Sequence, residues 1–155
     1  MALSQDILAE LAEIAPGTPL AEARATREAA TRHAQGSYET LFSQQDNDFV
    51  LDERFAVAAK VAKWHNVEAL AAHYAGFGLA DPTSARLTPA LRFARLLTFS
   101  PVEATPGALD ALKQAGGSKE GIVTLAQLIA FGSFESRLIV GLRLLNDKIV
   151  AASDC

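Results

Sequence analysis

The sequence predicts an all-α fold, a bundle of about six to eight helices. Alanine and leucine, which are strong helix formers, are abundant in the 155 residues. Apolar residues recur at helical spacing, whereas no stretch keeps the every-second-residue alternation typical of a strand. Glycine, proline and helix-capping residues divide the chain into segments, so each helix can be placed from its own start and stop signals.

In the first third of the chain, capping residues open the predicted helices, and glycine or proline closes them. A hydroxyl side chain directly before a helix can accept a hydrogen bond from the first turn, and proline suits the first helical position. A polar loop is expected at 43–48. The predicted helices are 4–15, capped by Ser4 and ended by Pro16-Gly17, then 18–33, opened by Thr18-Pro19, and 38–42, after a break or bend at Gly36-Ser37.

The remaining two thirds follow the same rules. Asn66 is expected to interrupt or recap one long helical stretch, and Gly132-Ser133 to kink or divide another. The whole chain, 1–155, is expected to form one domain. The predicted helices are 51–77, with the interruption at Asn66, then 88–99, which Ser100-Pro101 ends, then 106–115, and finally 118–151, which Ser118 caps.

Composition argues against two classes of partner. The net charge is -4, and no cluster of Lys and Arg offers a nucleic-acid surface. The longest apolar run, 121–134, falls short of the roughly 20 residues that a bilayer span needs. Residues 1–16 lack the basic start of a signal peptide, so a cytoplasmic protein is expected.

Cysteine and histidine usage argues against a metal site or a cofactor. The only cysteine, Cys155, is the last residue, so no intramolecular disulfide and no cysteine-based metal site can form. It is interpreted as an incidental residue on a frayed end. His65 and His73 do not have the i, i+4 spacing of a helical zinc pair. We expect neither a metal nor a cofactor.

The segment 121–134 indicates self-association. It is apolar on nearly every face, and such a helix must be covered on all sides. In a domain of this size, part of that cover is expected from a second subunit. The sequence therefore predicts a homo-oligomer.

Two residues in the segment 52–74 point to a known family: Glu53 near the start of one helix and His73 on the next. The pattern resembles alkylhydroperoxidase D-like proteins of the carboxymuconolactone decarboxylase family. There, a glutamate precedes a Cys-x-x-Cys by about a dozen residues, and a histidine follows four residues on. Here Asn66 and Ala69 stand at the cysteine positions, and Glu53 is one residue off the family spacing. The stretch 121–145 is similar to the tail of peroxidase-related members, so a family-like core would span about 38–150.

The resemblance implies a peroxidase site without its sulfur. The family's two cysteines act as peroxidatic and resolving thiols, and neither Asn66 nor Ala69 can replace them. No thiol peroxidase activity is therefore expected. The remaining chemistry would be proton transfer, with His73 as general acid and base and Glu53 as its partner. Asn66 would donate a hydrogen bond to a developing oxyanion.

Substrate contacts are expected from neighbouring side chains. Arg54 is a candidate cationic anchor for an acid, and His65 and Glu68 are further candidates. On one straight helix, Glu68 would lie about 140° from His73 around the axis, and His65 about 80°. Neither therefore shares a face closely with His73.

Three functions remain open at this point. The first is acid–base chemistry on a small organic acid, as in carboxymuconolactone decarboxylases. The second is a non-catalytic oligomeric scaffold or small-molecule binder. The third is a peroxiredoxin-type protein in name only, with the label inherited from the family. His73 is equally well interpreted as a half-buried, hydrogen-bonded core histidine, and Glu53 as an ordinary first-turn helix acid. A closed pocket with Glu53 within reach of His73 would favour catalysis, and packing without a cavity would favour the scaffold.

Overall fold

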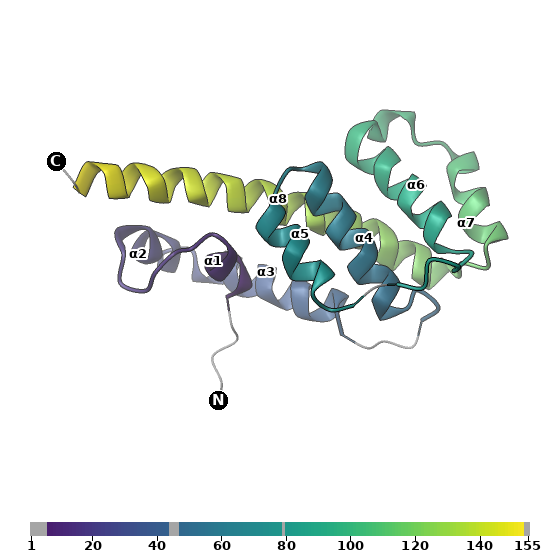
Figure 1. The fold of residues 1–155 in the computed structure, drawn as a ribbon, viewed down its shortest axis with the longest axis horizontal. Helices are drawn as coiled ribbons and strands as arrows, with labels where there is room; N and C mark the ends of the chain where they lie inside the picture. Colours follow the sequence, from purple (N-terminus) through teal and green to yellow (C-terminus); the bar gives the residue numbers. More distant parts are fainter. Residues whose placement is uncertain (1–5, 44–46, 79, 154–155) are drawn as a thin grey trace.

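The computed structural model describes residues 6–43, 47–78 and 80–153, and all regular structure in these ranges is helical. The all-α prediction is confirmed. Eight α-helices and two short 3-10 helices occur in the described residues (Figure 1). The α-helices are α1 (Ile7–Leu11), α2 (Pro19–Ala25), α3 (Glu28–Leu41), α4 (Leu51–Trp64), α5 (Glu68–Ala75), α6 (Leu87–Phe99), α7 (Asp110–Gln114) and α8 (Lys119–Ser153), and the 3-10 helices are η1 (Pro101–Glu103) and η2 (Pro106–Leu109).

The organising element is α8, a helix of 35 residues. It begins after Ser118, whose Oγ accepts a hydrogen bond from the backbone N–H of Gly121 at 3.0 Å, as predicted for its cap. Figure 1 shows α8 running along the molecule, with α6 and α7 near its start and α1 and α2 beside its C-terminal half. None of the helices in the described ranges combines the length and apolar composition needed to cross a bilayer.

Two apolar clusters hold the other helices to α8. The larger cluster joins α3, α4, α5 and α6 to its first half, and its fully buried members include Val61, Leu70 and Leu128. Burying each such aliphatic side chain stabilises the fold by roughly 1.5–3 kcal/mol. The smaller cluster, which contains Leu20 and Leu142, joins the α1–α2 segment to the second half of α8.

The turn between α4 and α5 confirms the predicted interruption at Asn66. This residue has a positive φ of 58°, a left-handed conformation that asparagine tolerates better than most residues. Its N–H donates to the carbonyl of Lys63 at 3.0 Å, and the N–H of Val67 donates to the carbonyl of Ala62 at 3.1 Å. These two bonds satisfy the last carbonyls of α4 and fold α5 back beside it.

At the two glycines predicted to break, bend or kink a helix, the chain stays helical. α3 runs without interruption through Gly36-Ser37, and Ser37 Oγ donates to the carbonyl of His33 within the helix. α8 is likewise undivided at Gly132-Ser133. A Cβ at Gly132 would lie 3.2 Å from Val61 Cγ1, so this glycine permits close packing of α8 on α4.

The N-terminal helices differ from prediction mainly in their boundaries. Thr18 caps α2 as expected, its Oγ1 accepting from the N–H of Ala21 at 3.3 Å, but the helix ends at Ala25 rather than near residue 33. α1 starts at Ile7 and is capped by Asp6, which accepts from Ala9. The proposed cap Ser4, Cys155 and part of the polar loop, residues 44–46, lie outside the described residues.

Candidate functional site

His73 lies in α5 and faces α3. Its Nε2 is 2.9 Å from the hydroxyl oxygen of Tyr38, and the edge of the imidazole meets the ring of Phe77 at a centroid distance of 5.2 Å. The ring is half-buried. Burial lowers the pKa of His73, although the nearby carboxylate of Glu10 opposes this shift. The imidazole is therefore neutral at pH 7 and able to accept a proton.

A second polar pair lies deeper in the bundle. The hydroxyl of Tyr74, the residue after His73, donates to Oε2 of Glu135 on α8 at 2.5 Å. Both side chains are fully buried. Burial raises the pKa of Glu135 from 4.5 to about 8, even though the bond from Tyr74 works in the opposite direction. Glu135 is thus a protonated carboxyl group at neutral pH.

The two pairs form one group, which we call the Tyr38–Glu135 cluster: Tyr38, His73, Tyr74 and Glu135. The rings of Tyr38 and Tyr74 are stacked, with centroids 6.4 Å apart. Burial, followed by the charges of Glu135 and Glu10, raises the pKa of Tyr38, so its hydroxyl stays protonated. Three helices distant in sequence, α3, α5 and α8, meet in this cluster.

Aromatic rings surround the cluster. Phe42 contacts the ring of Tyr38 at 5.3 Å and that of Tyr74 at 4.8 Å between centroids. Phe55 of α4 stacks on Phe42 and on Phe77. Apolar rings lower the local dielectric, which explains why burial dominates the pKa shifts.

Glu53 does not join this cluster. It is buried in the first turn of α4, and its Oε1 accepts a hydrogen bond from Ser84 Oγ. Its Oε2 has no hydrogen-bond partner among the described residues. The expected pairing of Glu53 with His73 is therefore absent, because the segment before α6 supplies a hydroxyl group to the carboxylate.

Asn66 is separated from both Glu53 and His73. It is exposed in the α4–α5 turn, whereas Glu53 lies at the opposite end of α4, roughly 18 Å away along the axis at 1.5 Å per residue. The role that the structure shows for Asn66 is structural, because its left-handed backbone conformation ends α4. The three residues expected to form a catalytic group are thus dispersed.

Arg54 is a buried clamp, and this corrects its expected place in a substrate site. Its Nε donates to the carbonyl of Phe49 at 2.7 Å, and its Nη1 donates to the carbonyls of Leu41 and Ser43 at 3.0 and 3.1 Å. Nη2 donates to Asn47 Oδ1 at 3.2 Å. Burial lowers the pKa of Arg54. The guanidinium holds the connection between α3 and α4 and does not face a groove.

The remaining two candidates are also apart from His73. His65 ends α4, and its Nε2 lies 3.1 Å from Ser133 Oγ on α8. Burial, with a smaller contribution from the charge of Arg137, lowers the pKa of His65. Glu68 is exposed at the start of α5, where it lines a groove of about 450 Å³ between α4 and α5.

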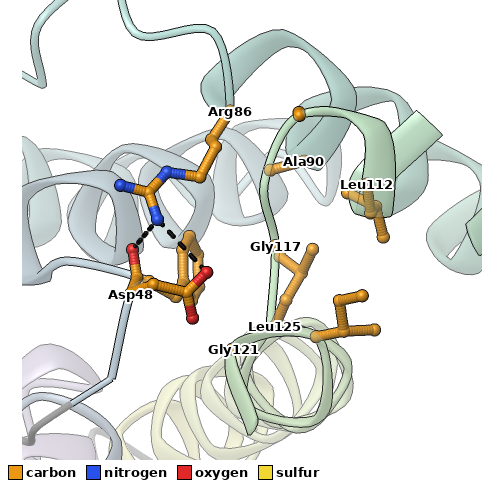
Figure 2. A pocket seen from close by; sticks show the side chains of 10 residues that line it. Asp48, Arg86, Ala90, Leu112, Gly117, Gly121 and Leu125 are labelled. Atoms are coloured by element: carbon orange, nitrogen blue, oxygen red, sulfur yellow. Dashed lines mark hydrogen bonds and ion pairs between the residues drawn. The ribbon is translucent and has the colours of Figure 1, made fainter. Parts of the chain in front are cut away.

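A small cavity of about 30 Å³ lies at the start of α8. Figure 2 shows side chains that line it. Arg86 points to Asp48 on one side, and apolar residues including Ala90, Leu112 and Leu125 line the other. Burial would raise the pKa of Asp48, but hydrogen bonds from Ser118 and the charge of Arg86 lower it overall. A cavity of this volume holds about one water molecule. Asp48 accepts hydrogen bonds from Arg86, directly before α6, and from Ser118, at the start of α8, and so joins the loop before α4 to both helices.

The described grooves do not include the cluster. The largest, about 950 Å³, lies between α3 and α8, where Gly36, Ala130 and Phe134 are among its lining residues. His73 lines neither this groove nor the cavity at the start of α8, the groove between α4 and α5, or the groove that Asp6 and Arg24 line. Within the described ranges, no three His, Cys, Asp or Glu side chains converge as a metal site would require.

Sequence reasoning missed Tyr38, Tyr74 and Glu135. One signal was present: Glu135 is a single carboxylate in the otherwise uncharged stretch 128–136. An acid in such a stretch must be buried or neutralised, and either case marks it for attention. The stacking of Tyr38 on Tyr74 left no comparable pattern in the sequence.

No protein-family model matches the chain, and no curated protein or solved structure matches it either. The resemblance to the alkylhydroperoxidase D-like proteins therefore stays a prediction.

Proposed function

We propose that the chain is a cysteine-less protein of the alkylhydroperoxidase D-like type that performs acid–base chemistry on a small organic acid. The proposal rests on the Tyr38–Glu135 cluster. A buried carboxyl group next to a hydrogen-bonded histidine and two tyrosines destabilises a fold relative to apolar packing. Perturbed titratable groups gathered in this way are typical of functional sites.

His73 is the proton-transferring group in this proposal. In the tautomer with its proton on Nε2, the ring donates to the hydroxyl oxygen of Tyr38, at 2.9 Å, and Nδ1 is the basic nitrogen. Because burial keeps the imidazole neutral, Nδ1 can accept a proton from a substrate near pH 7. Tyr38 orients the ring.

Glu135 has a positioning role. Its neutral form accepts the hydrogen bond from Tyr74 and places no negative charge beside Tyr38. The charge that Glu135 gains above its pKa of about 8 contributes to the raised pKa of Tyr38. Because burial lowers the pKa of His73, its ring stays neutral in alkaline solution, and turnover by neutral His73 is expected to fall as the solution becomes acidic.

No thiol peroxidase activity belongs to this proposal, because Asn66 and Ala69 carry no sulfur. An assay with an alkyl hydroperoxide and a dithiol reductant is expected to show no enzyme-dependent turnover. Activity that survived the substitution Cys155→Ser would contradict this expectation directly.

A non-catalytic scaffold or small-molecule binder is the second candidate, and two observations favour it: Glu53 binds Ser84 rather than His73, and none of the four described grooves is lined by His73. His73 itself packs among aromatic rings. A substrate would then need a movement of these rings to reach Nδ1.

A screen of small organic acids, including cyclic lactone acids, separates the two candidates. Binding is followed by thermal shift, and turnover by release of carbon dioxide or by loss of the lactone absorbance. We expect His73→Gln to abolish turnover and Tyr38→Phe to reduce it about tenfold or more. His33→Gln, at an exposed histidine of α3, is the matched control and should retain activity. Acids that bind without turnover, equally well to wild type and His73→Gln, would reject the acid–base proposal and support the binder.

A further inference from the structure

α8 carries most of the exposed large apolar side chains of the described residues. Five of the nine are on this helix: Val123, Phe134, Val140, Leu144 and Leu145. Phe134 is 45% exposed and Leu144 62% exposed. Single apolar residues on a surface are ordinary, whereas several exposed apolar residues on one helix are typical of an interface.

Eight exposed positions of α8 follow a regular repeat, and the exposed Val140 and Leu145 lie outside it. The eight positions alternate in spacing between four and three residues, and every one of them is exposed. Such spacing keeps side chains on one side of a helix, as in a coiled-coil seam. We call this set the α8 stripe: Val123, Gln127, Ala130, Phe134, Arg137, Gly141, Leu144 and Lys148.

We propose that a second copy of this chain binds along the α8 stripe, with the two α8 helices antiparallel about a twofold axis. In one register, Ala130 of each copy faces Gly141 of the other. Small residues then meet at both ends of the central contact and let the helices approach closely. A Cβ at Gly141 would have no atom within 4 Å, so this space is open in the single chain.

The charges of the α8 stripe favour a second copy of the chain as the partner and an antiparallel orientation of the two helices. The same register places Phe134 of one copy against Arg137 of the other, so that each guanidinium meets an aromatic face. It also brings Lys148 near Glu120 of the second copy. A parallel, in-register pair would instead oppose Arg137 to Arg137 and Lys148 to Lys148, and like charges in register are unfavourable. The stripe is therefore self-complementary only when antiparallel.

The size of the stripe predicts a reversible dimer. From Val123 to Lys148 the helix extends about 38 Å, and a contact about 10 Å wide would bury on the order of 400 Å² per copy. A standard stable interface buries about 800 Å² per partner. The groove between α3 and α8 shares Gln127, Ala130 and Phe134 with the stripe and adds to the contact. The dimer should therefore dissociate on dilution.

Sedimentation velocity over a dilution series tests the proposal. The wild-type chain should be dimeric at about 100 μM and increasingly monomeric below about 1 μM. Leu144→Glu should weaken the dimer at least tenfold. Val102→Glu is the matched control, since Val102 is 94% exposed in η1, outside the stripe. A wild-type chain that stays monomeric at the highest concentration, or equal weakening by both variants, would overturn the proposal.

Cross-linking tests the register. In a Cys155→Ser background, Ala130→Cys and Gly141→Cys chains are mixed and oxidised. We expect a rapid disulfide between unlike chains. Ala130→Cys alone should not cross-link to itself, because the two positions would be roughly 16 Å apart along the axis in this register. Self-linking of Ala130→Cys without linking of the mixture would show a parallel pair and reject the proposed arrangement.

Discussion

The hydroxyl of Tyr74 donates to Glu135 at 2.5 Å, and this bond joins α5 to the middle of α8 inside the apolar core. It is the only contact of the Glu135 carboxylate among the hydrogen bonds of the described residues, because Oε1 has no partner there. Burial raises its pKa to about 8, so the carboxyl group is neutral at pH 7. The predictions below begin from this pair.

Replacing Glu135 by Gln should change how stability depends on pH. The folded-state pKa of about 8 lies above the ordinary 4.5, so the folded chain holds a proton that the unfolded chain releases. This favourable difference is complete below about pH 4.5 and decreases by up to about 1.4 kcal/mol per pH unit as pH rises to 8. We expect the wild type to lose stability over this window relative to Glu135→Gln. Parallel urea-denaturation profiles for the two proteins would contradict the assignment.

Tyr74→Phe should destabilise the fold by about 1–3 kcal/mol, because it leaves a buried carboxyl oxygen without a donor. The same substitution in a Glu135→Leu background should be less destabilising, since no acceptor remains. Urea denaturation of the four proteins of this double-mutant cycle gives the coupling energy. A coupling energy near zero would mean that the 2.5 Å contact does not contribute to stability.

Acid should destabilise the chain in part through two histidines. Burial lowers the pKa values of both His65 and His73 below 6.5. The unfolded chain therefore binds protons more readily, and this part of the stability decreases as pH falls below 6.5. The double variant His65→Gln/His73→Gln should lose less stability than wild type between about pH 7 and pH 5. Titration of the ring protons by NMR measures the two pKa values directly, and values at or above 6.5 would disprove the explanation.

Arg54→Met should be among the most destabilising substitutions in the chain. It leaves the buried carbonyls of Leu41 and Phe49 without their donor, at a cost of about 3 kcal/mol or more in total. Arg32→Met is the matched control, because Arg32 makes only an exposed pair with Glu28. Urea denaturation should show little change for the control. Similar losses for the two variants would contradict the clamp.

Helix starts and stops were predictable where a residue acts on its own neighbours. Thr18 and Ser118 accept hydrogen bonds from the turns that follow them, and Asn66 ends α4 by its own backbone conformation. The expected interruptions at Gly36 and Gly132 do not occur. The sequence could not show this, because a glycine has the same local preference in a break and in a continuous helix. Only its surroundings differ, and at Gly132 they include Val61 of another helix.

The sequence by itself determined that this chain is helical and where most of its helices lie. It also determined that no thiol pair stands at the positions where the alkylhydroperoxidase D-like proteins have their two cysteines. Only the tertiary structure decided which side chains meet. Tyr38 and His73 are 35 residues apart, and Tyr74 and Glu135 are 61 apart. Capping and propensity act within about one helical turn, whereas these contacts depend on how α3, α5 and α8 pack. For that reason Glu53 binds Ser84 rather than His73, and Glu135 is the carboxyl group of the cluster.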